Sequence, residues 1–219
     1  MKEKQEKSIV IFLIALIFIF SFIVGYVFYS RRGYEYEYEG ITGKFLFSVD
    51  KHTGDEIHIL KFYTKTRFKP SQGYKVPFNY GPEELEIIPV EGEPRKEILD
   101  AKKVYFTRDV YLDQKTNEEI IVAIFTVDRI IGQNLLSNPI YNISTSFAAI
   151  ENNTLATELQ LPILACDQAN KARVIIWFKE GDENKVYYEN EYCIVAQFKE
   201  GDDPKKVATR LTYHILGIM

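Results

Sequence analysis

The sequence predicts an α+β fold in which an N-terminal transmembrane helix precedes a domain with a mixed or antiparallel sheet and a few helices. Three observations lead to this class. The stretch 8–29 is apolar and carries no charge. Segments typical of strands outnumber those typical of helices, and the helices fall between them at mixed positions, which favours α+β over a doubly wound fold. The segment 204–216 has the apolar spacing of an amphipathic C-terminal helix.

The uncharged stretch 8–29 is predicted to be a retained signal-anchor helix. At about 1.5 Å per residue it would be roughly 33 Å long, which matches a hydrocarbon core of about 30 Å. Tyr26 and Tyr29 lie at one end, where membrane proteins collect aromatic residues. The stretch is longer than the apolar region of a secretory signal peptide, and no small-residue cleavage site follows it.

Basic residues around this stretch predict the orientation. Three lysines precede it and Arg31 with Arg32 follow it, which favours a cytoplasmic N-terminus and an exported domain. The expected localisation is therefore a single-pass membrane protein with an extracytoplasmic C-terminal domain, and the lipid bilayer is the partner of 8–29. The expected organisation is a cytoplasmic segment 1–7, the helix 8–29 and a domain over 34–219, with two sublobes divided near 113–118.

Cys166 and Cys193 are the two cysteines of the chain. An even number of cysteines in an exported domain predicts a disulfide bond between them. Two alternatives stay open, a pair of buried free thiols and a metal-binding pair, although two ligands are few for a metal. Export would also make Asn142 and Asn152 candidate glycosylation acceptors, since each begins an Asn-x-Ser/Thr triplet.

The first part of the domain has the pattern of an antiparallel sheet. Tyrosine and glutamate alternate over 34–39, which predicts a strand with a solvated acidic face, or alternatively an acidic ladder for a metal or a partner. Strands over 44–49 and 56–63 flank a turn at 50–54, the outline of a hairpin. Proline and glycine interrupt 70–82, which predicts a surface loop.

The remaining elements follow from periodicity and turn residues. Helical turns are expected over 83–87 and 95–101, and a longer helix over 128–136. Strands are expected over 103–107, 120–127, 140–149, 173–178 and 186–198, the last divided by polar residues at 189–191. The helix 204–216 should bury Val207, Leu211 and Ile215 and turn Lys205, Lys206 and Arg210 to solvent.

The last third of the chain carries a resemblance to a known group. The segments are Leu-Pro-Ile-Leu-Ala-Cys-Asp at 161–167, the strand 174–176, Tyr-Cys-Ile-Val at 192–195 and the ending Leu-Gly-Ile-Met within 208–219. They resemble the C-terminal region of an uncharacterised group of small archaeal membrane-anchored proteins. The resemblance implies archaeal origin, export and a paired cysteine, and it implies no activity.

Motifs for several kinds of chemistry are missing from the sequence. His52 and His58 lie near Asp50 and Asp55, but the turn between them breaks the register, so no metal is expected. His214 is predicted to compensate a helix dipole. The chain has no Gly-x-Ser-x-Gly elbow and no glycine-rich phosphate loop, so no catalytic residue is assigned and no cofactor is expected.

Charge argues against a nucleic-acid partner, because 27 basic residues are scattered among 31 acidic ones and the net charge is −4. We therefore expect a membrane-anchored binding or scaffolding module of the cell envelope with a protein or envelope partner. One alternative is an enzyme whose site residues are distant in sequence. The other is a filament subunit of pilin type, although the pilin motif is missing where Lys7 and Ser8 precede the uncharged stretch.

Overall fold

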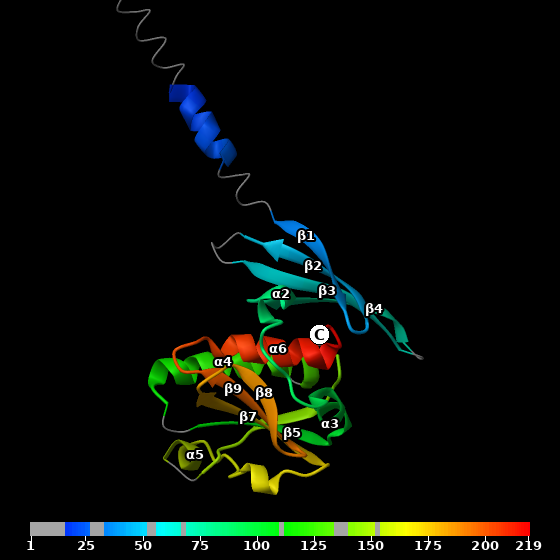
Figure 1. The fold of residues 1–219 in the computed structure, drawn as a ribbon, viewed down its shortest axis with the longest axis vertical. Helices are drawn as coiled ribbons and strands as arrows, with labels where there is room; N and C mark the ends of the chain where they lie inside the picture. Colours follow the sequence, from blue (N-terminus) through cyan, green and yellow to red (C-terminus); the bar gives the residue numbers. More distant parts are fainter. Residues whose placement is uncertain are drawn as a thin grey trace, which may run out of the picture.

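The computed structural model describes residues 16–26, 33–51, 56–66, 69–109, 112–133, 140–151 and 154–219. These residues form an α+β fold with one four-stranded and one five-stranded sheet. Figure 1 shows helices α4 (Gln114–Ile131) and α6 (Pro204–Leu216) in a layer between the two sheets. The main core cluster draws buried residues from both sheets and from this helical layer.

The prediction of a transmembrane helix over 8–29 is wrong for the residues that the structure describes. Within them, no helix is both long enough and apolar enough to cross a membrane. Residues 16–26 of the predicted stretch are helical. Residues 8–15 and 27–29 of the predicted helix lie outside the described residues.

The first sheet is an antiparallel meander of four strands in chain order. The strands are β1 (Tyr34–Gly40), β2 (Gly43–Asp50), β3 (Ile57–Thr66) and β4 (Lys69–Phe78). Alternate side chains of β2, β3 and β4 are buried toward the helical layer, among them Phe47, Leu60 and Phe78. The strands predicted over 34–39, 44–49 and 56–63 are thus confirmed.

The predicted surface loop over 70–82 is wrong for its first part, because 70–78 belong to β4. This strand lies at the edge of the sheet and pairs only with β3. Pro77 lies opposite Ile59 and is exposed. Proline is tolerated in an edge strand because its missing N–H costs no ladder hydrogen bond on the open side.

The second sheet has the strand order β6-β5-β7-β9-β8. Its strands are β5 (Lys103–Arg108), β6 (Ser144–Phe147), β7 (Arg173–Gly181), β8 (Lys185–Asn190) and β9 (Cys193–Lys199). All neighbouring pairs are parallel except β8 with β9. The polar residues expected to divide one strand over 186–198 therefore mark the turn between two antiparallel strands.

Helix α4 corrects another prediction, since 120–127 had the composition of a buried strand. Asp113 caps the helix, with Oδ1 accepting hydrogen bonds from the backbone N–H groups of Lys115 and Thr116. Ile120, Ile124 and Val127 are buried while Val122 and Phe125 are exposed, which is a helical period. Packing of this apolar face therefore overrides the strand preference of its β-branched residues. The sublobe boundary expected near 113–118 falls at the start of this helix.

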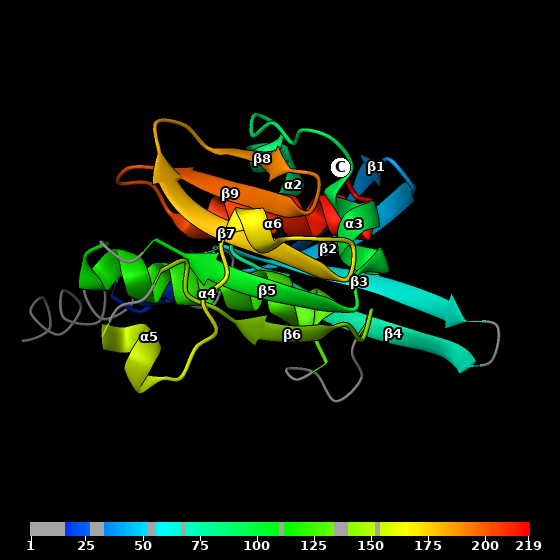
Figure 2. The same ribbon diagram turned by 90° about the horizontal axis from the view of Figure 1, so that it is seen from below.

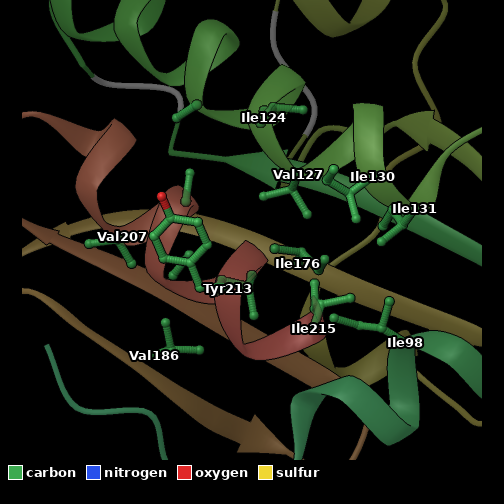
Figure 3. Close-up of a cluster of buried hydrophobic side chains, with 14 of the residues drawn as sticks. Ile98, Ile124, Val127, Ile130, Ile131, Ile176, Val186, Val207, Tyr213 and Ile215 are labelled. Carbon is green, nitrogen blue, oxygen red and sulfur yellow. The ribbon is translucent and has the colours of Figure 1, made fainter. Parts of the chain in front are cut away.

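Helix α6 is confirmed over the predicted range. Asp203 caps its N-terminus, and Gly217 ends it in the left-handed conformation with a φ of 75°. Val207, Leu211 and Ile215 are buried, and Figure 3 shows Val207 and Ile215 among the core side chains of the other elements. Arg210 does not point to solvent as expected, because its guanidinium donates to the carbonyls of Ile88 and Met219.

Two short helices link the two sheets, and a long connection covers the far face of the second sheet. The linking helices are α2 (Pro82–Leu85) and α3 (Pro94–Asp100). The connection from β6 to β7 carries α5 (Thr154–Glu158) and the 3₁₀ turn η1 (Cys166–Gln168). Leu164 and Cys166 of this connection pack with Ile175 and Cys193 of the sheet in a second, smaller core cluster. In Figure 2, α5 and β6 are seen below α4 and β5.

Candidate functional site

The second sheet has a topological switch point between β5 and β7. From β5 the chain passes through α4 to β6 on one side, and then returns across the opposite face to β7 on the other side. Open sheets of parallel strands bind their ligands at the carboxyl ends of the strands, where the connections leave in opposite directions. A ligand-binding site is therefore expected at the edge formed by the carboxyl ends of β5, β6, β7 and β9.

A cleft of about 690 Å³ lies at this edge. This volume is within the range of about 300–1,000 Å³ that is typical of small-molecule sites. Five carboxylates line the cleft, and each lies in the last residues of one of the four parallel strands or shortly after it. Leu112, Ile150 and Gly181 complete the lining. The carboxylates are Asp109, Glu151, Glu180, Asp182 and Glu200.

Asp109 and Glu180 are the two cleft carboxyl groups whose surroundings most affect their protonation. Burial raises the pKa of Asp109, while a hydrogen bond from Trp177 Nε1 at 2.9 Å opposes that rise. Burial also raises the pKa of Glu180, and repulsion from Glu200, Asp113 and Asp109 adds to it. Both groups therefore hold their protons more tightly than a solvated carboxyl group does.

The lining of the cleft contains no lysine, arginine or histidine. Lys179 lies outside this lining, and its charge lowers the pKa of Asp109. Across the described ranges, none of the five carboxylates of the cleft forms an ion pair. The same part of the chain contains no group of three acidic, histidine or cysteine side chains close enough to hold a metal ion. The cleft is thus an extended negative surface without a single point of convergence.

Gly181 keeps one wall of the cleft in place. A Cβ atom there would lie 2.4 Å from the side-chain amide carbon of Gln197. That amide is buried and donates hydrogen bonds to Asp182 Oδ1 at 3.2 Å and to the carbonyl of Glu183 at 3.0 Å. The missing side chain of Gly181 therefore leaves room for the amide that orients Asp182.

The disulfide predicted between Cys166 and Cys193 is confirmed, with Cα atoms 5.2 Å apart. It joins η1 to the first residue of β9, and Asn190 donates a side-chain hydrogen bond to the carbonyl of Cys166 beside it. The candidate glycosylation acceptor Asn142 is exposed and has a φ of 58°. The other, Asn152, lies outside the described residues. Use of either acceptor stays a prediction.

The histidines do not come together. His52 and Asp55 lie outside the described residues. His58 is buried, with Nε2 3.4 Å from Glu84 Oε1 and Nδ1 2.9 Å from the hydroxyl of Tyr36. A hydrogen bond joins Nδ1 to the Tyr36 hydroxyl, and the Glu84 carboxylate lies beside Nε2. His214 lies at the end of α6, beside the carbonyl of Met219.

The buried His58 predicts a loss of stability in mild acid. Burial lowers the pKa of His58 in the folded state, against the opposing effect of Glu84 and Glu56. The unfolded chain therefore takes up a proton first as the pH falls through the ordinary value of about 6.5, and the free energy of unfolding falls with it. Urea denaturation between about pH 7.5 and 5.5 should show a smaller decline for His58→Gln than for the native chain. Equal declines would contradict this account of His58.

No sequence motif marks the cleft carboxylates as a site. Each of Asp109, Glu180 and Glu200 lies at or directly after the end of a strand, which is the available signal. An acidic residue at the end of a strand indicates a shared site only when the strands are known to run parallel, because their carboxyl ends then meet at one edge.

No family model, no curated protein and no solved structure matches this chain. The likeness to the archaeal membrane-anchored group therefore stays a prediction.

Proposed function

We propose that the domain is an extracytoplasmic binding module of the cell envelope, and that its ligand is a small organic polycation held in the acidic cleft. The observation that carries this proposal is the set of five carboxylates at the switch point, with no basic residue in the lining. A bound cation would relieve the repulsion that Glu180 experiences from Glu200 and Asp109. Ligand binding at the carboxyl edge of a parallel sheet supports the same location.

The spacing of the carboxylates favours an extended ligand over a metal ion. Calcium and magnesium need several oxygen ligands within about 2.6 Å of one point. The described residues offer no group of three acidic side chains with that convergence. A flexible polyamine can instead place its ammonium groups at separate carboxylates, and Leu112 and Ile150 in the lining suit its methylene spacers.

The disulfide supports placement outside the cytoplasm. Disulfides persist in oxidising compartments and are rare where thiols are kept reduced. In this chain the bond joins the connection over the far face of the second sheet to the sheet itself. Residues from that connection, Ile150 and Glu151, also line the cleft.

A calorimetric titration of the full-length chain with spermidine at low ionic strength tests the proposal. We expect saturable binding that weakens when salt is raised from about 50 to 300 mM, because salt screens charge pairs at exposed sites. The double variant Glu180→Gln with Asp182→Asn should bind more weakly by up to about 25-fold, since each lost charge pair contributes a factor of up to about five.

The matched control is Glu91→Gln with Glu189→Gln, which removes the same charge from exposed positions outside the cleft. Its affinity should stay within about twofold of the native value, because long-range charge effects are screened. Equal losses in the two double variants would mean that spermidine follows net charge and not the cleft. Absence of saturable binding would contradict the proposal itself.

An enzyme is the second candidate, and one observation favours it. Asp109 and Glu180 both have raised pKa values and lie in one cleft, which is the arrangement that suits a general acid. A binding module returns its ligand unchanged, whereas an enzyme does not. Mass spectrometry of cationic ligands recovered after prolonged incubation with the full-length chain separates the two.

A further inference from the structure

A second hollow, apolar in character, lies between α4 and the part of the second sheet formed by β5 and β6. It has a volume of about 270 Å³ and is enclosed by α4, by the ends of β5 and β6 and by the segment after α5. Apart from Arg108, the side chains in its lining are all apolar. Three large ones at its rim stay partly in solvent, with exposed fractions of 40% for Phe125, 38% for Phe147 and 59% for Leu159. Exposed apolar side chains gathered around a hollow mark an interaction site.

Arg108 is the one charged residue of this lining. Strand side chains alternate, so Arg108 faces α4 while the neighbouring Asp109 faces the acidic cleft. Arg108 Nη1 donates to the backbone carbonyl of Asn117 at 3.0 Å. Within the described chain, this guanidinium has no carboxylate partner, and burial lowers its pKa without any compensating negative neighbour. A half-buried cation in that state lacks its counter-ion.

We propose that this hollow binds the anion of a medium-chain fatty acid, with the carboxylate paired to Arg108 and the hydrocarbon chain lying against Phe125, Phe147 and Leu159. The two parts of the ligand match the two parts of the site. A guanidinium binds a carboxylate through two parallel hydrogen bonds, and Arg108 has donors left for this. The hydrocarbon chain packs against the apolar rim, and this contact buries apolar surface that is otherwise exposed to water.

The size of the hollow limits the length of the chain. At about 30 Å³ for a group of methylene or water size, 270 Å³ holds roughly nine such groups. We therefore expect a saturated carboxylate of about eight to ten carbons to fill the hollow. Within that range, each methylene removed should weaken binding about fourfold, because its burial is lost.

Calorimetry of the full-length chain with decanoate and decanol, each below its micelle-forming concentration, tests the proposal. The two probes have ten carbons each and differ in the charge of the head. Decanoate should bind more tightly than decanol, because Arg108 attracts its carboxylate. Similar affinities for the two would overturn the proposal, since they would reduce the hollow to an unspecific apolar surface.

Two variants test the two halves of the site. Arg108→Gln should weaken decanoate binding by about tenfold to a hundredfold, the usual effect of losing a charged hydrogen-bond partner, and leave decanol binding nearly unchanged. Leu159→Gln, at an exposed rim position, should weaken both ligands alike. The controls are Lys96→Gln and Ile87→Gln, exposed positions outside the hollow, and neither should change binding. Native affinity for decanoate in Arg108→Gln would overturn the assignment.

A second copy of the chain is the competing occupant of this apolar face. Sedimentation of the full-length chain with and without decanoate separates the two occupants. Three results together would show that this face is an interface between copies: the chain self-associates, Phe147→Asp abolishes the association, and decanoate does not bind. The proposal would then fail. A sedimentation coefficient unchanged by Phe147→Asp, together with decanoate binding, supports the fatty-acid site.

Discussion

Replacing both cysteines, Cys166→Ala with Cys193→Ala, should lower the free energy of unfolding by about 3 to 4 kcal/mol. The bond closes a loop between residues 27 apart in the sequence, and in the chain-entropy model a loop of this length restricts the unfolded state by that amount. Domains of this kind have a total stability of about 5 to 15 kcal/mol, so the loss is a large share. Denaturant unfolding of the native and substituted chains measures it.

The control for this experiment is reductant. Reducing the native chain should give the same loss as the double substitution, because both open the loop and leave two small buried side chains. The substituted chain should not respond to reductant. A difference between the reduced native chain and the alanine chain would show that packing of the two side chains, and not loop closure, accounts for the loss.

Tyr213→Ala should cost about 3 to 5 kcal/mol, as truncation of a buried aromatic residue does. Tyr213 is fully buried in α6 and makes edge-to-face contacts with Phe47 and Phe78 of the first sheet, with ring centroids 5.9 and 4.7 Å apart. Its hydroxyl donates to the backbone carbonyl of Tyr80 at 2.7 Å. Figure 3 shows its ring within the core cluster, beside side chains from α4, α6 and the second sheet.

Tyr213→Phe separates the hydrogen bond from the ring. It should cost about 1 to 3 kcal/mol, because the carbonyl of Tyr80 loses its donor in a buried place. Ile87→Ala is the control for an apolar deletion, since Ile87 is 87% exposed and should change stability by no more than about half a kcal/mol. Thermal unfolding of the three variants measures these differences. Equal losses in Tyr213→Ala and Ile87→Ala would contradict the central role of the ring.

Local sequence patterns correctly predicted the elements in which the spacing of apolar and polar residues matches the period of a strand or a helix. The alternation of tyrosine and glutamate over 34–39 matches β1, and the capped, periodic segment 204–216 matches α6. The segment 120–127 was assigned wrongly because an apolar run is compatible with a strand or a buried helix, and only packing decides between them. The prolines of β4 suggested a loop because an edge strand cannot be recognised before the sheet is known.

The candidate site required the topology. Asp109, Glu180 and Glu200 lie at separate places in the sequence, and no motif distinguishes them from the other acidic residues. They meet because β5, β7 and β9 run parallel, with β5 at the switch point. Arg108 likewise gained meaning only from its place in an apolar lining without a counter-ion. The cysteine pair was predictable because the chain has two cysteines, an even number that favours a disulfide bond.

The position of α6 between the two sheets has a consequence for the order in which the chain folds during synthesis. The ribosome makes the four strands of the first sheet well before it makes Pro204–Leu216, which cover their apolar side. Phe47 and Phe78 contact Tyr213, so their native packing must wait until α6 has been made. The early sheet therefore presents an uncovered apolar face to chaperones while the rest of the chain is being translated.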